Sequence, residues 1–200
     1  MNSSLLDSLQ PKPNLPDKEV IKNIIGGKEE DFEILVNRYY RQILVYLCRL
    51  LNFNQGDAED VLQQTFANAY SNIVTYNPSL SFSSWLYRIA HNLAIDLIRK
   101  KSKFYIIDTN NQVTQNQIHS NDSVMQAAQE VAESKITKQR LESVLRNLDI
   151  DNRNLLTMFY LQGLSINEIS DILKVTANSV GVKLTRARDK ARLIIYKLKL

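Results

Sequence analysis

Hydrophobic side chains recur every three or four residues along most of the chain, which is the period of an amphipathic α-helix. In the first half, this pattern predicts four helices, over about residues 17–25, 29–51, 57–74 and 83–101. Gly26-Gly27 is expected to end the first helix, and Pro78 to separate the last two, because the residue before a proline is disfavoured in the α-helical region. Asp17 and Asp57 are expected to cap the first and third helices.

The helical pattern returns in the second half after a polar interruption. The first part of 108–129 is rich in Asn, Gln, Ser and Thr, so it cannot bury enough apolar surface to offset the entropy of ordering it. Helical periodicity resumes within 124–148, and Asp151 is expected to cap the next helix, which Gly163 ends. The sequence therefore predicts an all-α fold of two helical domains joined by a flexible polar linker. The expected boundaries are a disordered tail at 1–16, a first domain at 17–103, a linker at 104–135 and a second domain at 136–200.

The most specific local pattern is GLSINEISDILKVTANSVGVKLTRARDKAR, at 163–192. Ser165 and Glu168 have the spacing of a capping box, Lys174 begins a tight turn, and Thr176 caps a second helix that is polar and basic. Two short helices joined in this way describe a helix-turn-helix, although a helical hairpin with a solvated basic face is the alternative. The side chains expected to meet DNA from this motif, at 165–188, are Asn178, Ser179, Lys183, Arg186 and Arg188.

Gly181 lies inside the second helix of this motif, where glycine costs about 1 kcal/mol relative to alanine. Two explanations stay open: the glycine lets the helix approach a backbone closely, or it is only tolerated. Val182 beside it is apolar, and either meets a thymine methyl group or packs within the protein.

Positive charge is concentrated in two segments. The whole chain has a net charge of +4, whereas 82–103 holds five Lys and Arg against one acid, and 139–200 holds 11 against 6. Two basic patches are typical of a nucleic-acid binder with two points of contact. Two solvated helix faces would also explain the distribution.

Composition argues against an enzyme and a membrane protein. Two histidines and a single cysteine, Cys48, offer no metal-ligand cluster or catalytic triad, and no glycine-rich phosphate loop is present, so no cofactor, metal or catalytic residue is expected. Cys48 lies in an apolar run and is expected to pack as a small hydrophobe. No stretch reaches the roughly 18 apolar residues of a membrane span, and 1–16 lacks the pattern of a signal peptide. A cytoplasmic protein without membrane insertion is expected.

Two segments of the first domain are more informative than the helix-turn-helix alone. Residues 57–66, DAEDVLQQTF, and 82–101, FSSWLYRIAHNLAIDLIRKK, strongly resemble the two signature segments of domain 2 in the extracytoplasmic-function (ECF) subfamily of sigma-70 RNA polymerase sigma factors. Residues 148–192 resemble domain 4 of the same family. The resemblance implies a protein that binds core RNA polymerase and directs promoter-specific initiation. Domain 2 would read and help to melt the −10 element, and domain 4 would read the −35 element.

The resemblance also implies roles for residues of domain 2. In the family, the segment matching 57–66 docks onto a coiled coil of the largest polymerase subunit. This role carries over to Asp57, Asp60, Gln63 and Phe66, although Phe66 is equally suited to the core. The helix matching 82–101 and the loop before it, which resembles a pocket for a flipped base, contact the −10 element in the family. The residues implied there are Tyr76, Asn77, Arg88, Asn92, Arg99 and Lys100.

The partners implied are core RNA polymerase, through its largest-subunit coiled coil and its flap, promoter duplex, the melted non-template strand, and an anti-sigma factor, which is typical of the family. The chain departs from the family at Lys174, where the turn usually has Gly, and at Gly181-Val182, which replace the more usual Lys-Ser. The alternative function is a stand-alone helix-turn-helix transcriptional regulator. That alternative explains 163–192 but gives no reason for DAEDVLQQTF or for the second basic helix.

Overall fold

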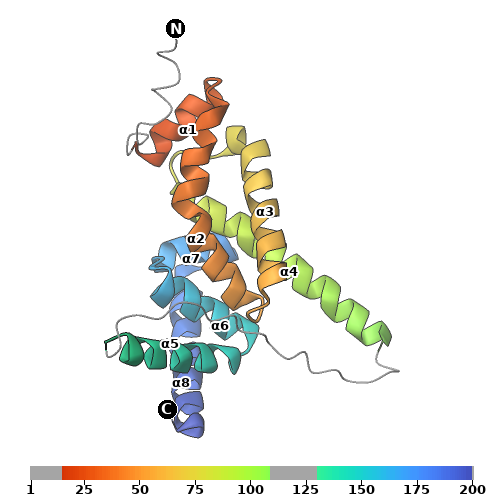
Figure 1. Ribbon diagram of the computed structural model, residues 1–200, viewed down its shortest axis with the longest axis vertical. Helices are drawn as coiled ribbons and strands as arrows, with labels where there is room; N and C mark the ends of the chain where they lie inside the picture. The colour runs from red at the N-terminus through yellow and green to blue at the C-terminus, as the bar shows by residue number, and fades with distance from the viewer. Residues whose placement is uncertain (1–14, 109–129, 200) are drawn as a thin grey trace.

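The computed structural model describes residues 15–108 and 130–199, and every element in these two ranges is helical. Figure 1 shows the helices as an elongated stack, with α1 near one end and the C-terminal end of α8 at the other. The expectation of an all-α fold with two helical domains is confirmed. Nearly all of the tail at 1–16 and the central part of the expected linker lie outside the described residues.

The first half is built from four α-helices and two short 3-10 turns. Their bounds are α1 Asp17–Ile25, η2 Glu29–Asp31, α2 Phe32–Leu50, α3 Gln55–Ser71, η3 Ile73–Thr75 and α4 Phe82–Asp108. Gly26 and Gly27 end α1 as predicted, and Gly27 has a φ of 99°, which a side chain would strain. Helix α4 continues to Asp108, seven residues past its expected end at Lys101, and so enters the segment assigned to the linker.

The second half contains four more α-helices and one π-helical turn. They are α5 Glu130–Arg146, α6 Ile150–Leu156, η4 Thr157–Leu161, α7 Ile166–Leu173 and α8 Ala177–Leu198. Helix α6 runs directly into the wider turn η4, and Gly163 follows with a φ of 68°. Helix α8 packs against α6 and α7, and α7 also lies against η4 and against α4 from the first half.

Three predicted N-caps were wrong by one to three residues. Helix α3 is capped by Asn54, whose side chain accepts from the Asp57 amide, and α6 is capped by Asp149 in place of Asp151. Asp17 is the first residue of α1, and its carboxylate accepts hydrogen bonds from Arg38 and Tyr39 of α2. In each case the predicted cap lies within one turn of the observed N-cap. Packing of the apolar positions decides at which residue the helix begins.

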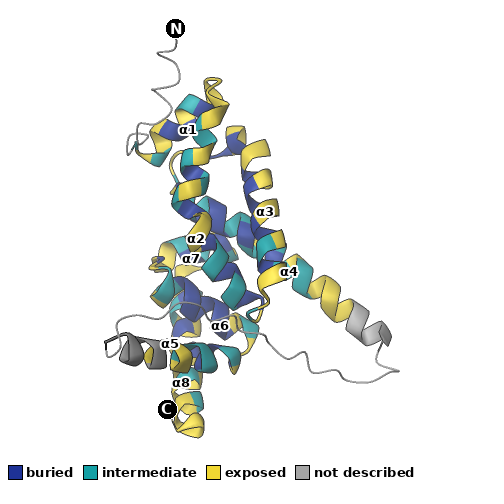
Figure 2. Cartoon of the chain, viewed as in Figure 1, coloured by how far each residue is buried: buried dark blue, intermediate teal, exposed yellow. Residues whose placement is uncertain are grey.

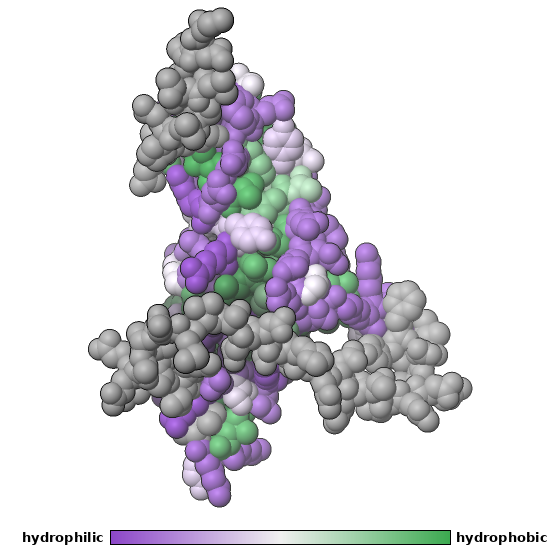
Figure 3. Space-filling view, viewed as in Figure 1, coloured by the Kyte–Doolittle hydropathy of each residue, from purple (hydrophilic) through white to green (hydrophobic). Residues whose placement is uncertain are grey.

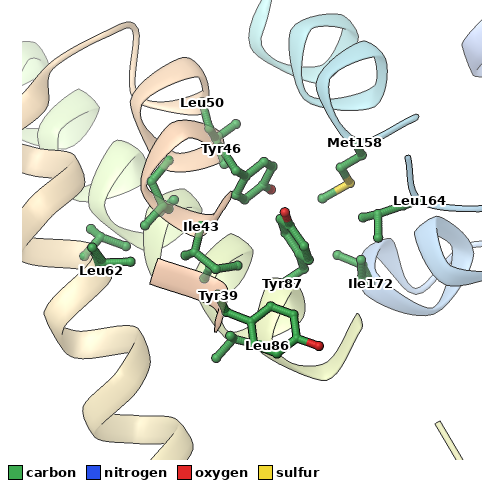
Figure 4. Close-up of a cluster of buried hydrophobic side chains, with 14 of the residues drawn as sticks. Tyr39, Ile43, Tyr46, Leu50, Leu62, Leu86, Tyr87, Met158, Leu164 and Ile172 are labelled. Carbon is green, nitrogen blue, oxygen red and sulfur yellow. The ribbon is translucent and has the colours of Figure 1, made fainter. Parts of the chain in front are cut away.

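The two halves share one hydrophobic core (Figure 2). Figure 4 shows Tyr46 and Tyr87 of the first half lying toward Met158, Leu164 and Ile172 of the second. All five side chains are at most 5% exposed, and the rings of Tyr46 and Tyr87 meet edge to face at 5.2 Å. We call this contact between the two halves the junction. Cys48 is half-buried, and burial raises the pKa of its thiol, in agreement with a packing role.

Several polar groups inside the junction are paired across it. The hydroxyl of Tyr46 donates to Asn154 Oδ1 at 2.9 Å, and that of Tyr87 donates to Gln162 Oε1 at 2.6 Å. The guanidinium of Arg153 donates to the Arg49 carbonyl at 3.3 Å and to Asn52 Oδ1 at 3.2 Å. Because an unpaired buried polar group is costly, these bonds fix how α6 and η4 lie against α2 and α4.

His91 lies beside this network, with Nδ1 3.2 Å from the Tyr46 hydroxyl. Burial of the ring is the main cause that lowers the pKa of His91 to about 4, and Arg99 lowers it further, against the opposing effect of Asp151. Above pH 6.5 the ring is neutral in both the folded and the unfolded chain, so its pairing is fully retained. Below that pH the unfolded chain takes up the proton first, and the folded state loses stability as the pH falls toward 4.

We therefore expect acid to destabilise the wild-type chain more than a His91→Gln variant. Between pH 7 and pH 5, wild type should lose about 1–2 kcal/mol more of its free energy of unfolding than the variant, since the ring is not fully enclosed. Urea unfolding at the two pH values measures the difference. Equal losses in the two proteins would show that His91 is not buried in its neutral form.

Candidate nucleic-acid interface

The helix-turn-helix forms as the sequence predicts. Ser165 and Glu168 make a complete capping box, with the Ser165 hydroxyl accepting from the Glu168 amide and the Glu168 carboxylate accepting from the Ser165 amide. Lys174 ends α7 in the left-handed region at a φ of 55°, the position where glycine is favoured because it has no Cβ. Thr176 then caps α8 by accepting from the Ser179 amide. The turn is therefore tight although it contains a lysine.

One face of α8 carries the side chains expected to meet DNA. Asn178, Lys183 and Arg186 are exposed, and neither Lys183 nor Arg186 makes an ion pair within the described residues. Lys190 follows Lys183 by seven residues and so joins this face, although sequence reasoning missed it. Its amine pairs with Asp149 at 2.9 Å. Asp149 also accepts hydrogen bonds from Asn152. Burial acts to raise the pKa of Asp149, but the hydrogen bonds from Asn152 and Lys190 lower this pKa to about 2.

Two of the residues predicted for this face lie differently. The Ser179 hydroxyl is 2.9 Å from that of Thr176, so it belongs to the helix cap. Arg188 bonds Thr185 and lies beside a separate apolar groove, away from Lys183 and Arg186. The sequence placed Arg188 among the DNA contacts, whereas in the structure it lies on the other side of α8.

Helix α4 presents the second set of candidate DNA contacts. Arg88, Asn92 and Arg99 follow one another at spacings of four and seven, which places them on one face. Asn92, Arg99 and Lys100 are exposed, and Arg88 is half-buried, with an enclosed Nε that has no partner among the described residues. Arg99 makes only a long contact of 3.6 Å with exposed Asp96, a pair of small energetic weight.

Asn92 and Trp85 line a groove of about 360 Å³ between α3 and α4. Amide and hydroxyl groups surround it, and we call it the amide groove; its lining residues are Asn68, Asn72, Thr75, Trp85, Ile89, Asn92, Leu93 and Asp96. Amides can pair with base edges, and an indole ring offers a surface for stacking. Sequence reasoning identified only Asn92 here as a contact, because the amides of α3 lie in a different segment of the chain.

The residues expected to form a base pocket in the preceding loop do not both face solvent. Tyr76 is 7% exposed, packs edge-on against Phe82 and Trp85, and donates its hydroxyl to the Leu80 carbonyl at 2.5 Å. Tyr76 therefore supports the loop from inside. Asn77 is exposed, and its side-chain oxygen accepts from the Ser79 amide and hydroxyl, so it shapes the turn while remaining accessible.

The acidic segment of α3 is divided between its surface and its core. Asp60 and Gln63 are exposed, whereas Phe66 is 8% exposed and packs edge-on with Phe32. Asp57 pairs with Lys101 near the far end of α4, so it ties α3 to α4. Of the four residues implied for polymerase binding, Asp60 and Gln63 therefore remain as exposed polar side chains that a partner can contact.

A third surface is almost purely apolar. A groove of about 460 Å³ lies between α5, η4 and α8, with arginines at its rim; we call it the apolar groove. It is lined by Thr137, Arg140, Leu141, Val144, Leu145, Leu156, Tyr160, Leu161, Arg188, Ala191, Arg192 and Ile195. Hydrophobic side chains also remain exposed along the end of α8, and Figure 3 shows a hydrophobic patch there; Tyr196 is 84% exposed. Contiguous exposed apolar surface of this kind is typical of a protein-binding site.

Within the described ranges, the chain contains no cluster of three or more His, Cys, Asp or Glu able to hold a metal ion. A search of the same residues finds no helix both long and apolar enough to cross a bilayer.

Comparison with known proteins identifies both halves. Residues 35–104 match the family model for sigma-70 region 2, and residues 138–190 match the model for sigma-70 region 4. The chain is 30% identical over 184 residues to the ECF RNA polymerase sigma factor SigW of Bacillus subtilis, covering 88% of this chain and 94% of the relative. It is 26% identical over 192 residues to the ECF RNA polymerase sigma-E factor of Haemophilus influenzae, covering 88% and 93%.

Two solved structures share the fold. CnrH in complex with the cytosolic domain of CnrY matches with a TM-score of 0.64 at 23% identity, over 90% of this chain and 97% of that one. The sigma factor RpoE in complex with the anti-sigma factor NepR from Bartonella quintana matches with a TM-score of 0.66 at 17% identity, over 84% and 98%.

Gly181 allows a test that separates its two explanations. A Cβ built on Gly181 meets nothing within 4 Å, so Gly181→Ala should raise the free energy of unfolding by about 1 kcal/mol, the helix propensity difference. Chemical denaturation measures this gain. If the glycine serves close approach to DNA, the variant will be more stable but bind duplex less tightly; unchanged binding would show that glycine is only tolerated.

Proposed function

The chain belongs to the ECF subfamily of sigma-70 RNA polymerase sigma factors, and from that premise we propose how its surfaces divide the work of promoter recognition. It is a sigma factor that binds core RNA polymerase and directs promoter-specific initiation. The observation that supports the division best is that each half carries a helix with exposed cations, α4 in the first half and α8 in the second. The stand-alone regulator is disfavoured, because the match to the family extends through both halves.

The first surface in this proposal is the exposed face of α3, which binds the largest-subunit coiled coil of core polymerase. Asp60 and Gln63 supply its polar contacts, whereas Asp57 acts through its ion pair with Lys101, which holds the end of α4. Phe66 is assigned to the core and not to this surface. The apolar groove is the second polymerase contact and receives the flap, since an apolar floor with an arginine rim suits an amphipathic helix with acidic flanks.

DNA is read by the two halves in different ways. Arg88, Asn92, Arg99 and Lys100 of α4 contact the −10 element, and the amide groove with Trp85 receives an unstacked base of the non-template strand. Asn178, Lys183 and Arg186 of α8 read the −35 element in the major groove, with Lys190 on the phosphates. Arg188 is excluded from this set because it faces the apolar groove.

The remaining partners follow from the same assignment. Both structural relatives described above were solved with a second protein, and an anti-sigma factor that blocks polymerase contacts is proposed for this chain as well. Its relatives are sigma factors, and the chain acts by binding and positioning, without catalysis of its own and without a cofactor. The site of action is the cytoplasm, where core polymerase and promoter DNA meet.

Transcription with purified components tests the proposal. Core RNA polymerase incubated with total genomic DNA should yield new 5′ ends only when this chain is present, and these ends should share −35 and −10 sequences. Sequencing of the transcripts measures both. Absence of new starts, together with tight binding of the chain alone to duplex DNA, would favour the stand-alone regulator.

Two double variants should separate polymerase binding from DNA binding. Asp60→Ala/Gln63→Ala should weaken binding to core polymerase about tenfold and leave the isolated chain's binding to promoter duplex unchanged. Lys183→Ala/Arg186→Ala should bind core normally. The isolated Lys183→Ala/Arg186→Ala chain should bind promoter duplex at least about tenfold more weakly and lose preference for it over unrelated duplex, because both side chains are assigned to base edges.

Each double variant is the control for the other, and Lys22→Ala, which removes an exposed lysine of α1, controls for a general change of charge. Fluorescence anisotropy with labelled core and labelled duplex supplies both measurements. The assignment fails if either double variant loses both kinds of binding while its helicity is unchanged.

A further inference from the structure

Cationic side chains from both halves converge on one cleft. This interdomain cleft has a volume of about 420 Å³, and it is lined by Arg99 of α4 and by Lys183 and Arg186 of α8. Arg99 makes only the 3.6 Å contact with Asp96. Neither Lys183 nor Arg186 makes an ion pair among the residues that the structure describes. Because like charges that converge without a counter-ion repel one another, an anion bound in the cleft relieves this repulsion.

The acidic residues of the cleft do not cancel its positive charge. Asp149 is paired with Lys190, which also lines the cleft, at 2.9 Å. Four cations and two acids line the cleft in all, which leaves a net charge of +2. The second acid, Asp151, is exposed, and a carboxylate in such a place can accept hydrogen bonds from the hydroxyls of a ribose, as acidic residues do in dinucleotide-binding sites.

Behind the cations, the lining of the cleft is enclosed and largely apolar. Its apolar members are buried or half-buried: Ile95, Leu155, Leu173 and Val175. His91 and Asn154 line the same cleft, and the His91 ring uses Nδ1 on the Tyr46 hydroxyl. Within the described part of the chain its Nε2 makes no hydrogen bond. Apolar side chains suit the faces of a planar base, and an imidazole and an amide can pair with its edge.

Duplex DNA accounts for only part of this lining. It explains the exposed cations, but its stacked and paired bases give no role to the enclosed His91 and Asn154. The volume of the cleft falls within the range of about 300–1,000 Å³ that is typical of small-molecule sites. Phosphates are held in proteins by charge-assisted hydrogen bonds from Arg and Lys. A small ligand with a base, a sugar and phosphates therefore matches each part of the cleft.

We propose that the interdomain cleft is a binding site for a nucleoside polyphosphate, with the phosphates on the cations of both walls and the base against the apolar lining beside His91. Binding of the nucleotide does not depend on the proposed function. Its consequence rests on that function, because Lys183 and Arg186 are also assigned to the −35 element. A bound nucleotide therefore competes with promoter duplex for these two side chains.

Calorimetric titration of the full chain with ATP and with GTP tests the site. At least one of the two should bind with one molecule per chain, whereas inorganic tripolyphosphate, which lacks base and sugar, should bind at least about tenfold more weakly. Arg99→Ala and Lys183→Ala, one from each wall, should each weaken nucleotide binding about tenfold, because each removes a charge-assisted contact. Lys22→Ala, which removes an exposed lysine of α1, should bind nucleotide as wild type does.

The ring of His91 supplies a second measurement. The chain has two histidines, so a His91→Gln variant assigns the ring signal of His91 in NMR spectra. Nucleotide should shift this signal, and tripolyphosphate should leave it nearly unchanged. The proposal is overturned if neither nucleotide binds at about 1 mM, if both cleft variants bind as tightly as wild type, if tripolyphosphate binds as tightly as nucleotide, or if the ring signal does not move.

Competition with DNA separates this site from the proposed function. With nucleotide at about ten times its Kd, the apparent affinity of the isolated chain for promoter duplex should fall about tenfold, and tripolyphosphate at the same concentration controls for ionic effects. Nucleotide binding without competition would support the site and count against the assignment of Lys183 and Arg186 to the −35 element. Failure of transcription with core polymerase would overturn the proposed function, while calorimetry would still decide on the site.

Discussion

Tyr46 is enclosed on all sides, and the placement of the second half depends on how its hydroxyl is satisfied. The exposed fraction of its side chain is 0%, and burial raises the pKa of the phenol well above its ordinary value. A hydroxyl buried without a partner costs several kcal/mol, on the order of 2–7 by transfer scales. Its acceptor, Asn154, is itself buried and belongs to α6, more than one hundred residues along the chain. The Tyr46 hydroxyl therefore links the two halves, with Asn154 Oδ1 at 2.9 Å from the second half and His91 Nδ1 at 3.2 Å from the first.

Much of the fold could be predicted because the determinants are local. The capping box of Ser165 and Glu168, the turn at Lys174 and the cap at Thr176 lie within twelve residues of one another, and the structure reproduces each. The N-caps of α3 and α6 were missed because Asn54 and Asp149 compete with Asp57 and Asp151 within a turn. The choice between them is made by burial of apolar residues such as Ala58 and Leu155, which a local pattern does not fix.

The candidate site was less predictable, since it depends on which side of a helix faces a neighbour. Arg188 and Arg186 are two residues apart and equally basic, yet only Arg186 lines the cleft between the halves. Phe66 and Tyr76 were assigned to binding from their place in a motif, but both are enclosed by aromatic side chains from other segments. Conversely, the segment Asn152–Asn154 has a polar composition typical of a surface, and it is buried because its partners lie in α2 and at Asp149.

The junction combines apolar contacts with polar groups at their border. A purely apolar contact of this size would expose a continuous hydrophobic surface whenever the halves parted, and such surfaces associate with other proteins. Here the hydroxyls of Tyr87 and Ser84 and the carboxylate of Glu168 border the apolar contacts, and water can replace each of their partners. Although partial burial acts to raise the pKa of Glu168, its hydrogen bonds to Ser165, Ser84 and Ser81 lower it, so the group stays ionised whether or not the serines of α4 are in contact. The Ser165–Glu168 capping box lies entirely within the second half, so this cap of α7 is made without any residue of α4.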